Sequence, residues 1–272
     1  YEYLCHDVYP DGLVAVGLVR ENGLAARLWR RLNRACYARA RTCYVVGRDM
    51  ARLLAGRYAV AEERIVFFPC WSPVEWPRRP PVESAFSARL GLEGKVIVQY
   101  SGNMGLWHDM VTLVDAAARC GDDPGIHFLF VGNGVRRREA QARARDLGAG
   151  NITWMDLAPP QDLADLLRCC HLALVSLRAG LAGVAVPSKL YGILAAGRAV
   201  VAQVPDDSEV AAVVREEACG VVVPPADVDA LAAAIRRLAA DEAERTAMGE
   251  RAFAAYAGKY ARARAAQRAE RM

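Results

Sequence analysis

The sequence lacks the signatures of several protein classes. No stretch approaches the roughly 20 uncharged apolar residues that a membrane-spanning helix needs. The eight cysteines form no C-x-x-C pair, which argues against a zinc site or a redox pair. We therefore expect no metal and no disulfide, and we interpret the cysteines as small buried apolar residues in a reducing compartment.

The first residues also lack the features of an export signal. Residues 1–5 contain neither a basic region nor a small-residue cleavage site. No Met opens the chain, so we expect it to begin inside a longer gene product. The net charge of +4 is too small to indicate nucleic-acid binding by itself. These observations predict a cytoplasmic protein with no nucleic-acid partner.

A regular alternation of strand and helix patterns begins near residue 96. Several of the apolar runs show no polar alternation, which is typical of parallel strands covered on both faces. The predicted strands cover residues 96–100, 126–131, 152–155, 172–177, 199–202 and 220–223. The pattern predicts a doubly wound parallel α/β sheet, which binds ligands at the carboxyl ends of its strands.

The residues before this sheet resemble the end of a second α/β unit. We predict strands at 3–5, 42–46 and 65–68, and helices at 24–36 and 49–57. Five prolines between Pro69 and Pro81 indicate a linker. The predicted division is a partial N-terminal domain at 1–78, a linker at 79–94, a C-terminal domain at 95–257 and a terminal helix at 258–272.

Five short segments carry a resemblance to a known family. Gly102-Asn103-Met104-Gly105 follows the first strand of the predicted sheet, and Gly132-Asn133-Gly134 ends the second. Pro187-Ser188-Lys189-Leu190 opens a helix, and residues 220–227 follow the last strand. Upstream, His6-Asp7-Val8-Tyr9-Pro10 is similar to a D-x-[WY]-P segment. In this order, the segments resemble glycosyltransferase family 4, especially the bacterial capsule and exopolysaccharide enzymes with a P-S-K-L motif.

The resemblance implies a GT-B fold, in which two Rossmann-like domains face a cleft and the terminal helix crosses back to the N-terminal domain. It implies a retaining transfer of sugar from a nucleotide sugar, for which a UDP-sugar is our best candidate, without metal or other cofactor. It also implies a polyprenyl-diphosphate-linked or glycan acceptor at the inner face of the cytoplasmic membrane, in cell-envelope polysaccharide synthesis.

A site of this kind must stabilise a departing diphosphate. Without a metal, backbone N–H groups, helix dipoles and cationic side chains hold the charge. The predicted diphosphate-binding residues are Gly102, Asn103, Gly105, His108, Ser188 and Lys189. An ordinary tight turn is the alternative for the glycine loop, and a surface lysine on a capped helix is the alternative for Lys189. His108 either donates to the diphosphate or simply lies at a helix start.

The resemblance also suggests nucleoside-binding and catalytic residues. The predicted nucleoside contacts are Gly132, Asn133, Gly134, Met155, Leu157 and Gly192. For the glycine triplet, a simple turn is the alternative. We predict that His6, Asp7 and Lys189 are catalytic, although a buried histidine at a strand end is an alternative for His6. Glu209 is expected to interact only with the dipole of its own helix.

The family's pair of acidic residues, spaced E-x7-E, is missing. The two positions fall near Val184 and on Gly192. This departure leaves two alternatives open: an epimerase-like GT-B protein that acts on sugar nucleotides, and a degenerate nucleotide-binding module without turnover. A nicotinamide dehydrogenase is disfavoured because no G-x-G-x-x-G follows the first strand.

Residues 20–41 contain seven arginines and one glutamate, interleaved with leucines and Trp29. A basic amphipathic helix with an aromatic residue can lie on an anionic membrane surface. The alternative is a solvated helix whose apolar stripe packs on its own domain. The lipid-linked acceptor implied by the resemblance makes a peripheral membrane contact a reasonable prediction.

Overall fold

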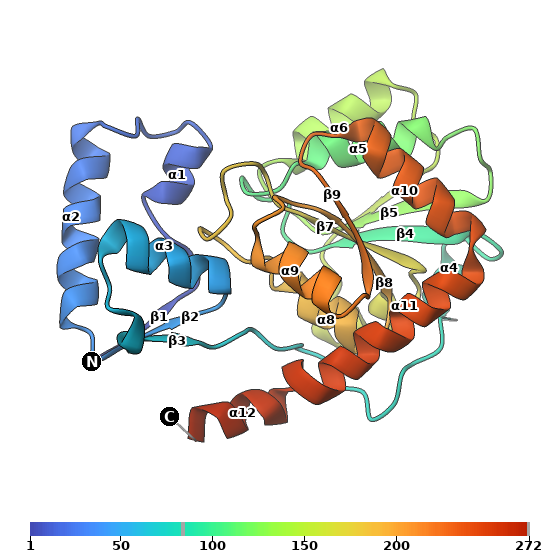
Figure 1. Ribbon diagram of the computed structural model, residues 1–272. Coiled ribbons are helices and arrows are strands. Elements are labelled where there is room, and N and C mark those ends of the chain that lie inside the picture. The colour runs from blue at the N-terminus through green and yellow to red at the C-terminus, as the bar shows by residue number, and fades with distance from the viewer. Residues whose placement is uncertain (83–84, 271–272) are drawn as a thin grey trace.

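The computed structural model describes residues 1–82 and 85–270, which form two parallel α/β units (Figure 1). The larger unit holds a six-stranded sheet in the order β6-β5-β4-β7-β8-β9. Its strands are β4 (Val96–Ser101), β5 (Ile126–Val131), β6 (Ile152–Met155), β7 (Leu172–Ser176), β8 (Ala199–Gln203) and β9 (Gly220–Val223). The predicted doubly wound α/β class is confirmed. The chain reverses its direction of winding between β4 and β7, which is where such sheets bind ligands.

Helices cover both faces of this sheet. Every residue of β5, β7 and β8 is buried, as expected for strands packed on both sides. The helices are α5 (Met110–Arg119), α6 (Arg137–Asp146), α7 (Leu163–Arg168), α8 (Lys189–Ala196), α9 (Glu209–Glu216), α10 (Val228–Ala240) and α11 (Glu242–Ala255), with a 3-10 turn, η2 (Pro160–Asp162), before α7. Side chains of Asp109, Ser208, Asp227 and Asp241 cap α5, α9, α10 and α11. Helix α11 was not predicted.

The smaller unit holds a three-stranded parallel sheet in the order β1-β2-β3. Its elements are β1 (Glu2–Cys5), α1 (Asp11–Ala15), α2 (Leu24–Arg39), β2 (Thr42–Val45), α3 (Arg48–Tyr58), η1 (Glu62–Arg64) and β3 (Ile65–Phe67). The buried carboxylate of Asp11 accepts hydrogen bonds from Tyr58 and Arg30. This network fixes α1, an element that was not predicted, against α2 and α3.

The proline-rich segment between the units is packed rather than free. Helix α4 (Ala85–Arg89) lies inside the predicted linker 79–94, while residues 83–84 fall outside the described residues. The Arg198 guanidinium donates to the carbonyls of Pro80 and Pro81 at 3.3 and 2.6 Å. The described part of this segment is therefore held against the larger unit, while its assignment as a linker stays a prediction.

The chain ends in a broken helix. A π-helical turn, η3 (Tyr256–Tyr260), separates α11 from α12 (Arg262–Glu270). The predicted terminal helix at 258–272 thus starts later, and residues 271–272 lie outside the described residues. Figure 1 shows α12 running toward the side on which the smaller unit lies. Over the described ranges, no helix is both long and apolar enough to cross a membrane.

The two units contact each other through α3 and the loops before α8 and α9. The buried Asp49 carboxylate accepts from the Gly183 and Glu209 amides at 2.8 and 3.0 Å. Glu209 is also buried, and its carboxylate accepts from the Arg48 amide at 2.8 Å and from Arg48 Nε at 3.0 Å. Glu209 therefore joins the two units, which corrects the expectation that it serves only its own helix.

All eight cysteines are free thiols. Six are buried, as predicted, because small apolar side chains pack well between sheet and helices. Cys36 is exposed on α2 and Cys70 is half-buried, so the prediction of burial is wrong for these two.

Candidate functional site

A cleft of about 490 Å³ lies where the carboxyl ends of β4 and β7 meet the smaller unit. Its volume is in the range of small-molecule sites. The predicted site residues that line it are Asp7, Gly102, Asn103, His108, Leu157, Ser188, Lys189 and Gly192. An antiparallel bridge between Asp7 and Ala185 brings the smaller unit to this edge of the sheet. The topology thus brings residues that are more than 180 positions apart in the sequence into one cleft.

Lys189 is the most unusual group in the cleft. Its Nζ lies 3.4 Å from the centroid of the Tyr100 ring and has no hydrogen-bond partner among the described residues. Burial holds the pKa of this amine well below its ordinary value of 10.5. A β-carbon placed on Gly102 would lie 3.5 Å from the same Nζ. The amine therefore faces the glycine loop, and an anion between them would stabilise its charged form.

The loop after β4 offers some backbone donors and uses others. The Gly102 amide donates to the Val131 carbonyl at 2.9 Å, and the Met104 amide donates to the Asn133 carbonyl at 2.8 Å. The amides of Asn103 and Gly105 have no partner within residues 1–82 and 85–270. An anion in the cleft would therefore meet the Asn103 donor, while Gly102 serves by its lack of a side chain and Gly105 does not line the cleft.

Helix α8 begins at the same place. Ser188 precedes it, is exposed, and makes no side-chain cap to the helix. The Leu190 amide donates to the Pro187 carbonyl at 3.2 Å, whereas the Ser188 and Lys189 amides make no bond to the described part of the chain. The start of α8 thus has unsatisfied N–H groups and the positive end of the helix dipole.

His108 is held in one orientation by the sheet. Its Nδ1 lies 2.6 Å from the Ser176 carbonyl oxygen, which can only accept, so Nδ1 carries a proton. Burial and the nearby Lys189 lower the pKa of His108 to about 3. The neutral ring therefore presents an acceptor, Nε2, on its other side. It would donate to an anion only after gaining a second proton.

The glycine triplet after β5 packs against the loop after β4 and does not line the cleft. Gly132 has φ +134°, and a β-carbon there would lie 1.9 Å from the Gly102 carbonyl oxygen. A β-carbon on Gly134 would lie 2.4 Å from the Met104 carbonyl oxygen. Both positions need glycine for close backbone approach. The turn alternative accounts for them, whereas their role in nucleoside binding stays a prediction.

The remaining predicted residues also lie outside the cleft lining. Asn133 accepts a hydrogen bond from Arg137 and points to the surface. Gly105 belongs to the loop after β4 but does not line the cleft. Met155 packs partly into the core. His6 is exposed beside Asp7. Burial raises the pKa of the Asp7 carboxyl, and the neighbouring His6 opposes that effect.

Several apolar residues of the cleft were not predicted. Trp71 and Pro73 come from the proline-rich segment, and Trp107 comes from the loop before α5. Further apolar contacts come from Leu163, Leu167 and Leu177. A tryptophan near a glycine loop can indicate a surface on which a ligand ring stacks, so Trp107 could have been recognised from the sequence. Asp7 is the one carboxylate that lines the cleft in the described ranges.

No group of three or more His, Cys, Asp or Glu side chains within residues 1–82 and 85–270 is arranged to hold a metal ion. Whether the site works without a metal stays a prediction. The groups available for a negative charge are the Lys189 amine, the free amide of Asn103 in the loop after β4, and the free amides at the start of α8.

The fold and cleft define a protein of the GT-B glycosyltransferase class. The structure matches WaaG, a glycosyltransferase involved in lipopolysaccharide biosynthesis, with a TM-score of 0.75 at 19% identity, over 98% of this chain and 73% of WaaG. It matches Anabaena HepE in complex with UDP-glucose with a TM-score of 0.77 at 16% identity, over 99% of this chain and 72% of HepE. These likenesses establish the fold.

Sequence comparison gives the family. The chain belongs to the family described as "Glycosyl transferases group 1", which it matches over residues 95–241. It is 30% identical over 231 residues to the "Probable glycosyltransferase WbjE" of Pseudomonas aeruginosa, and 28% identical over 237 residues to the "Putative colanic acid biosynthesis glycosyl transferase WcaI" of Escherichia coli K12. The matches cover 84% and 85% of this chain but only 57% and 58% of those relatives.

Proposed function

We propose that the protein transfers a sugar from a nucleotide sugar to a polyprenyl-diphosphate-linked or glycan acceptor in polysaccharide synthesis, with retention at the anomeric carbon. Membership of the group 1 family supports glycosyl transfer. The relatives' names support polysaccharide synthesis, and the structures of HepE with UDP and UDP-glucose support UDP as the leaving group. Placement within family 4 and a cytoplasmic location belong to the same proposal.

The observation that carries the proposal is the unpartnered amine of Lys189. A buried cation without a counter-ion is unfavourable unless a ligand supplies the charge. This cation lies at the positive end of α8, opposite a loop with two free amides. Such an arrangement fits a diphosphate, which brings several negative oxygens to one place.

The proposed chemistry follows from that placement. The bond between the anomeric carbon and the diphosphate oxygen breaks, and the acceptor hydroxyl forms the new bond on the same face of the sugar. Lys189 and the Asn103 amide stabilise the charge on the departing diphosphate. The acceptor proton leaves toward the Asp7 side of the cleft, where the raised pKa suits a carboxylate that takes up a proton.

Calorimetric titration of this chain with UDP, GDP, ADP and NAD tests the donor proposal. We expect selective binding of UDP, and at least tenfold weaker binding by Lys189→Ala. Lys259→Ala is the matched control, because Lys259 is exposed on η3 and does not line the cleft. Preference for another nucleotide would replace UDP. No binding of any of the four would favour the degenerate module.

Helix α2 supports the proposed contact with a membrane surface. Leu24, Leu28 and Leu32 are 83%, 61% and 57% exposed, so the apolar stripe does not pack on the part of its unit that this chain contains. The Trp29 ring stacks on the Tyr9 ring. The centroid of the Tyr9 ring lies 5.9 Å from that of Trp107, which lines the cleft. Exposed arginines flank the stripe, as on helices that bind anionic lipid.

Vesicle sedimentation tests the membrane proposal. Vesicles with anionic phosphatidylglycerol should retain the chain, and neutral phosphatidylcholine vesicles should not. Leu28→Glu should reduce retention severalfold, whereas Leu147→Glu, at an exposed leucine on the larger unit, should not. Equal retention by the anionic and the neutral vesicles would contradict the proposal.

A further inference from the structure

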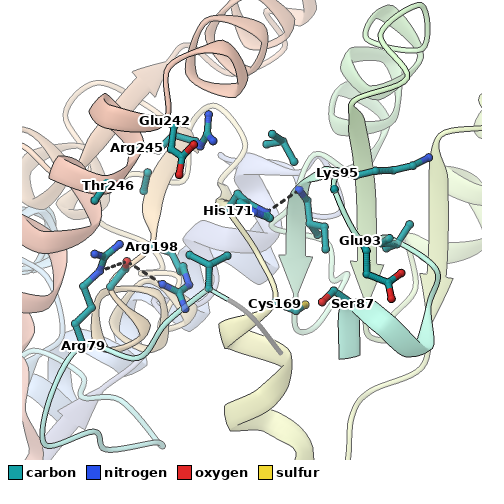
Figure 2. A pocket seen from close by; sticks show the side chains of 17 residues that line it. Arg79, Ser87, Glu93, Lys95, Cys169, His171, Arg198, Glu242, Arg245 and Thr246 are labelled. Carbon is teal, nitrogen blue, oxygen red and sulfur yellow. Dashed lines mark hydrogen bonds between the residues drawn. The ribbon is translucent and has the colours of Figure 1, made fainter. Parts of the chain in front are cut away.

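A second cavity, of about 640 Å³, lies at the opposite edge of the six-stranded sheet (Figure 2). The amino ends of β4 and β8 reach it, as do His171 just before β7 and the start of α11. It shares no lining residue with the cleft that holds Lys189. The proposed glycosyl transfer does not use it.

Arginines converge on this cavity. Figure 2 shows Arg79 and Arg198 directed at the same oxygen, the Gly197 carbonyl, at 3.2 and 3.4 Å. Arg198 is 2% exposed, and its Nε has no partner among the described residues. Arg245 donates to the Leu238 and Ala239 carbonyls. Neutral carbonyls orient the guanidinium groups of Arg79 and Arg198, whereas the carboxylates of Glu242 and Asp241 partly offset the charge of Arg245.

The cavity holds little negative charge to balance them. In the described ranges, the one ion pair that any of the three arginines makes is a distant contact of 3.9 Å between Arg79 and Glu250. The lining carboxylates, Glu93 and Glu242, are exposed and form no ion pair with described residues. Burial, with smaller contributions from the nearby charges of Arg79 and Arg168, lowers the pKa of Arg198 to about 10.

The positive charges of the arginines also affect His171. Its Nδ1 accepts from the Ile97 amide at 3.0 Å, so the proton of the neutral ring is on Nε2. Burial, together with Arg245 and Arg198, lowers the pKa of His171 to about 4. The ring therefore adds an N–H donor to a cavity whose walls are rich in positive charge. An anion would relieve the repulsion between the arginines and favour protonation of His171.

We propose that this cavity binds a small phosphate-bearing anion, at a site separate from the cleft. Arginine forks suit the several oxygens of such a ligand, and the volume holds a group larger than a single phosphate. Helix α8 runs from Lys189 in the cleft to Gly197 at this cavity, and β4 runs from Val96 to the glycine loop. Both elements therefore join the anion site to the cleft.

Calorimetry with pyrophosphate tests the site. The background is Lys189→Met, which removes the cation of the cleft, so that binding there does not obscure the result. We expect this background to retain one pyrophosphate site, and Arg79→Gln with Arg245→Gln to weaken it at least tenfold. The matched control is Arg119→Gln with Arg236→Gln, two arginines that lie outside the cavity lining. No binding in the background, or equal binding by both arginine pairs, would overturn the proposal.

A second measurement needs no arginine variant. The chain has four histidines, so the ring of His171 can be followed by NMR after assignment with His171→Asn. Saturating pyrophosphate should raise the pKa of His171 from about 4 by one unit or more. UDP should not do so, which separates this site from the cleft. An unchanged His171 titration in saturating pyrophosphate would refute the proposal even if the proposed glycosyl transfer is correct.

Discussion

Helix α8 has a buried cation at each end, and the two are held very differently. At the start, the Lys189 amine has no hydrogen-bond partner in the described ranges. Beyond the end, Arg198 donates to the carbonyls of Pro80, Pro81, Arg168 and Gly197. A positive charge is favourable near the carboxyl end of a helix and unfavourable near its amino end. The fold therefore gives Arg198 carbonyl acceptors and the favourable end of the helix, and it gives Lys189 neither.

This difference separates a structural cation from one placed for a ligand. Arg198 fixes the proline-rich segment to the larger unit, because its bonds reach carbonyls on both. Lys189 contributes nothing comparable to the fold and faces a loop with free amides. Variants at the two ends of α8 can therefore test that contrast.

Replacing Arg198 should have the largest effect. Arg198→Met leaves several buried carbonyls without donors, so we expect the free energy of unfolding to fall by about 3 kcal/mol. Urea denaturation measures the change. Arg237→Met, at an arginine whose side chain is 52% exposed, should stay within about 0.5 kcal/mol of the parent. Equal free energies of unfolding for the two variants would show that the hydrogen bonds from Arg198 do not hold the proline-rich segment in place.

Replacing Lys189 should change stability in the opposite sense. Lys189→Met removes a buried unpartnered amine, so the free energy of unfolding should rise by about 1 kcal/mol while UDP binding weakens at least tenfold. Denaturation and calorimetry on the same preparation measure both. Lys259→Met, at a lysine that lies outside both cavities, should alter neither the stability nor the UDP affinity by a comparable amount. A Lys189→Met protein that is less stable than the parent would place this lysine with Arg198 as a structural cation.

Acid should destabilise the protein through the histidine near each end of α8. The pKa values of His108 and His171 are lowered from 6.5 to about 3 and about 4. Below pH 6.5 the unfolded chain therefore binds more protons, so the stability present at neutral pH falls as the pH falls. Each histidine should account for a loss of about 2 kcal/mol at pH 5.

Single variants separate the two contributions. His108→Asn keeps a donor for the Ser176 carbonyl, and His171→Asn keeps an acceptor for the Ile97 amide. Each should lose less stability than the parent between pH 7.5 and pH 5, as measured by urea denaturation. If neither variant changed the dependence on pH, the two rings would not be desolvated in the folded protein.

Much of the fold could be predicted because the strands are continuous apolar runs between turn residues. Helix α11 was missed because most of its buried positions are small residues, Gly249, Ala252 and Ala255, which form no marked apolar stripe in the sequence. Helix α1 was missed because it is short and depends on Asp11, whose partners lie on α2 and α3. These elements depend on tertiary contacts that local patterns do not reveal.

The site was predictable only in part. The loop at Gly102 and the helix start at Lys189 follow strands that meet at one sheet edge, so topology alone brings them together. Trp71 was missed because a proline-rich segment indicates a linker, whereas here it forms a wall of the cleft. The glycine triplet was assigned to nucleoside binding because sequence cannot distinguish a ligand's approach from that of a neighbouring backbone, as at Gly132 and Gly102.

The smallest effect concerns the space around α8. A β-carbon on Gly192, inside the helix, would meet Leu167 at 3.6 Å and Pro73 at 4.0 Å, which are ordinary contacts. Gly192→Ala should therefore stabilise the protein by about 0.5–1 kcal/mol, because alanine loses less backbone entropy in a helix. Gly249, in α11, faces the other end of α8, where a β-carbon would lie 2.4 Å from the Gly197 carbonyl oxygen. Gly249→Ala should destabilise instead, and thermal unfolding of the two variants measures the opposite signs. Destabilisation by both would mean that the cleft end of α8 is packed as tightly as the Arg198 end, leaving no room for a ligand beside Gly192.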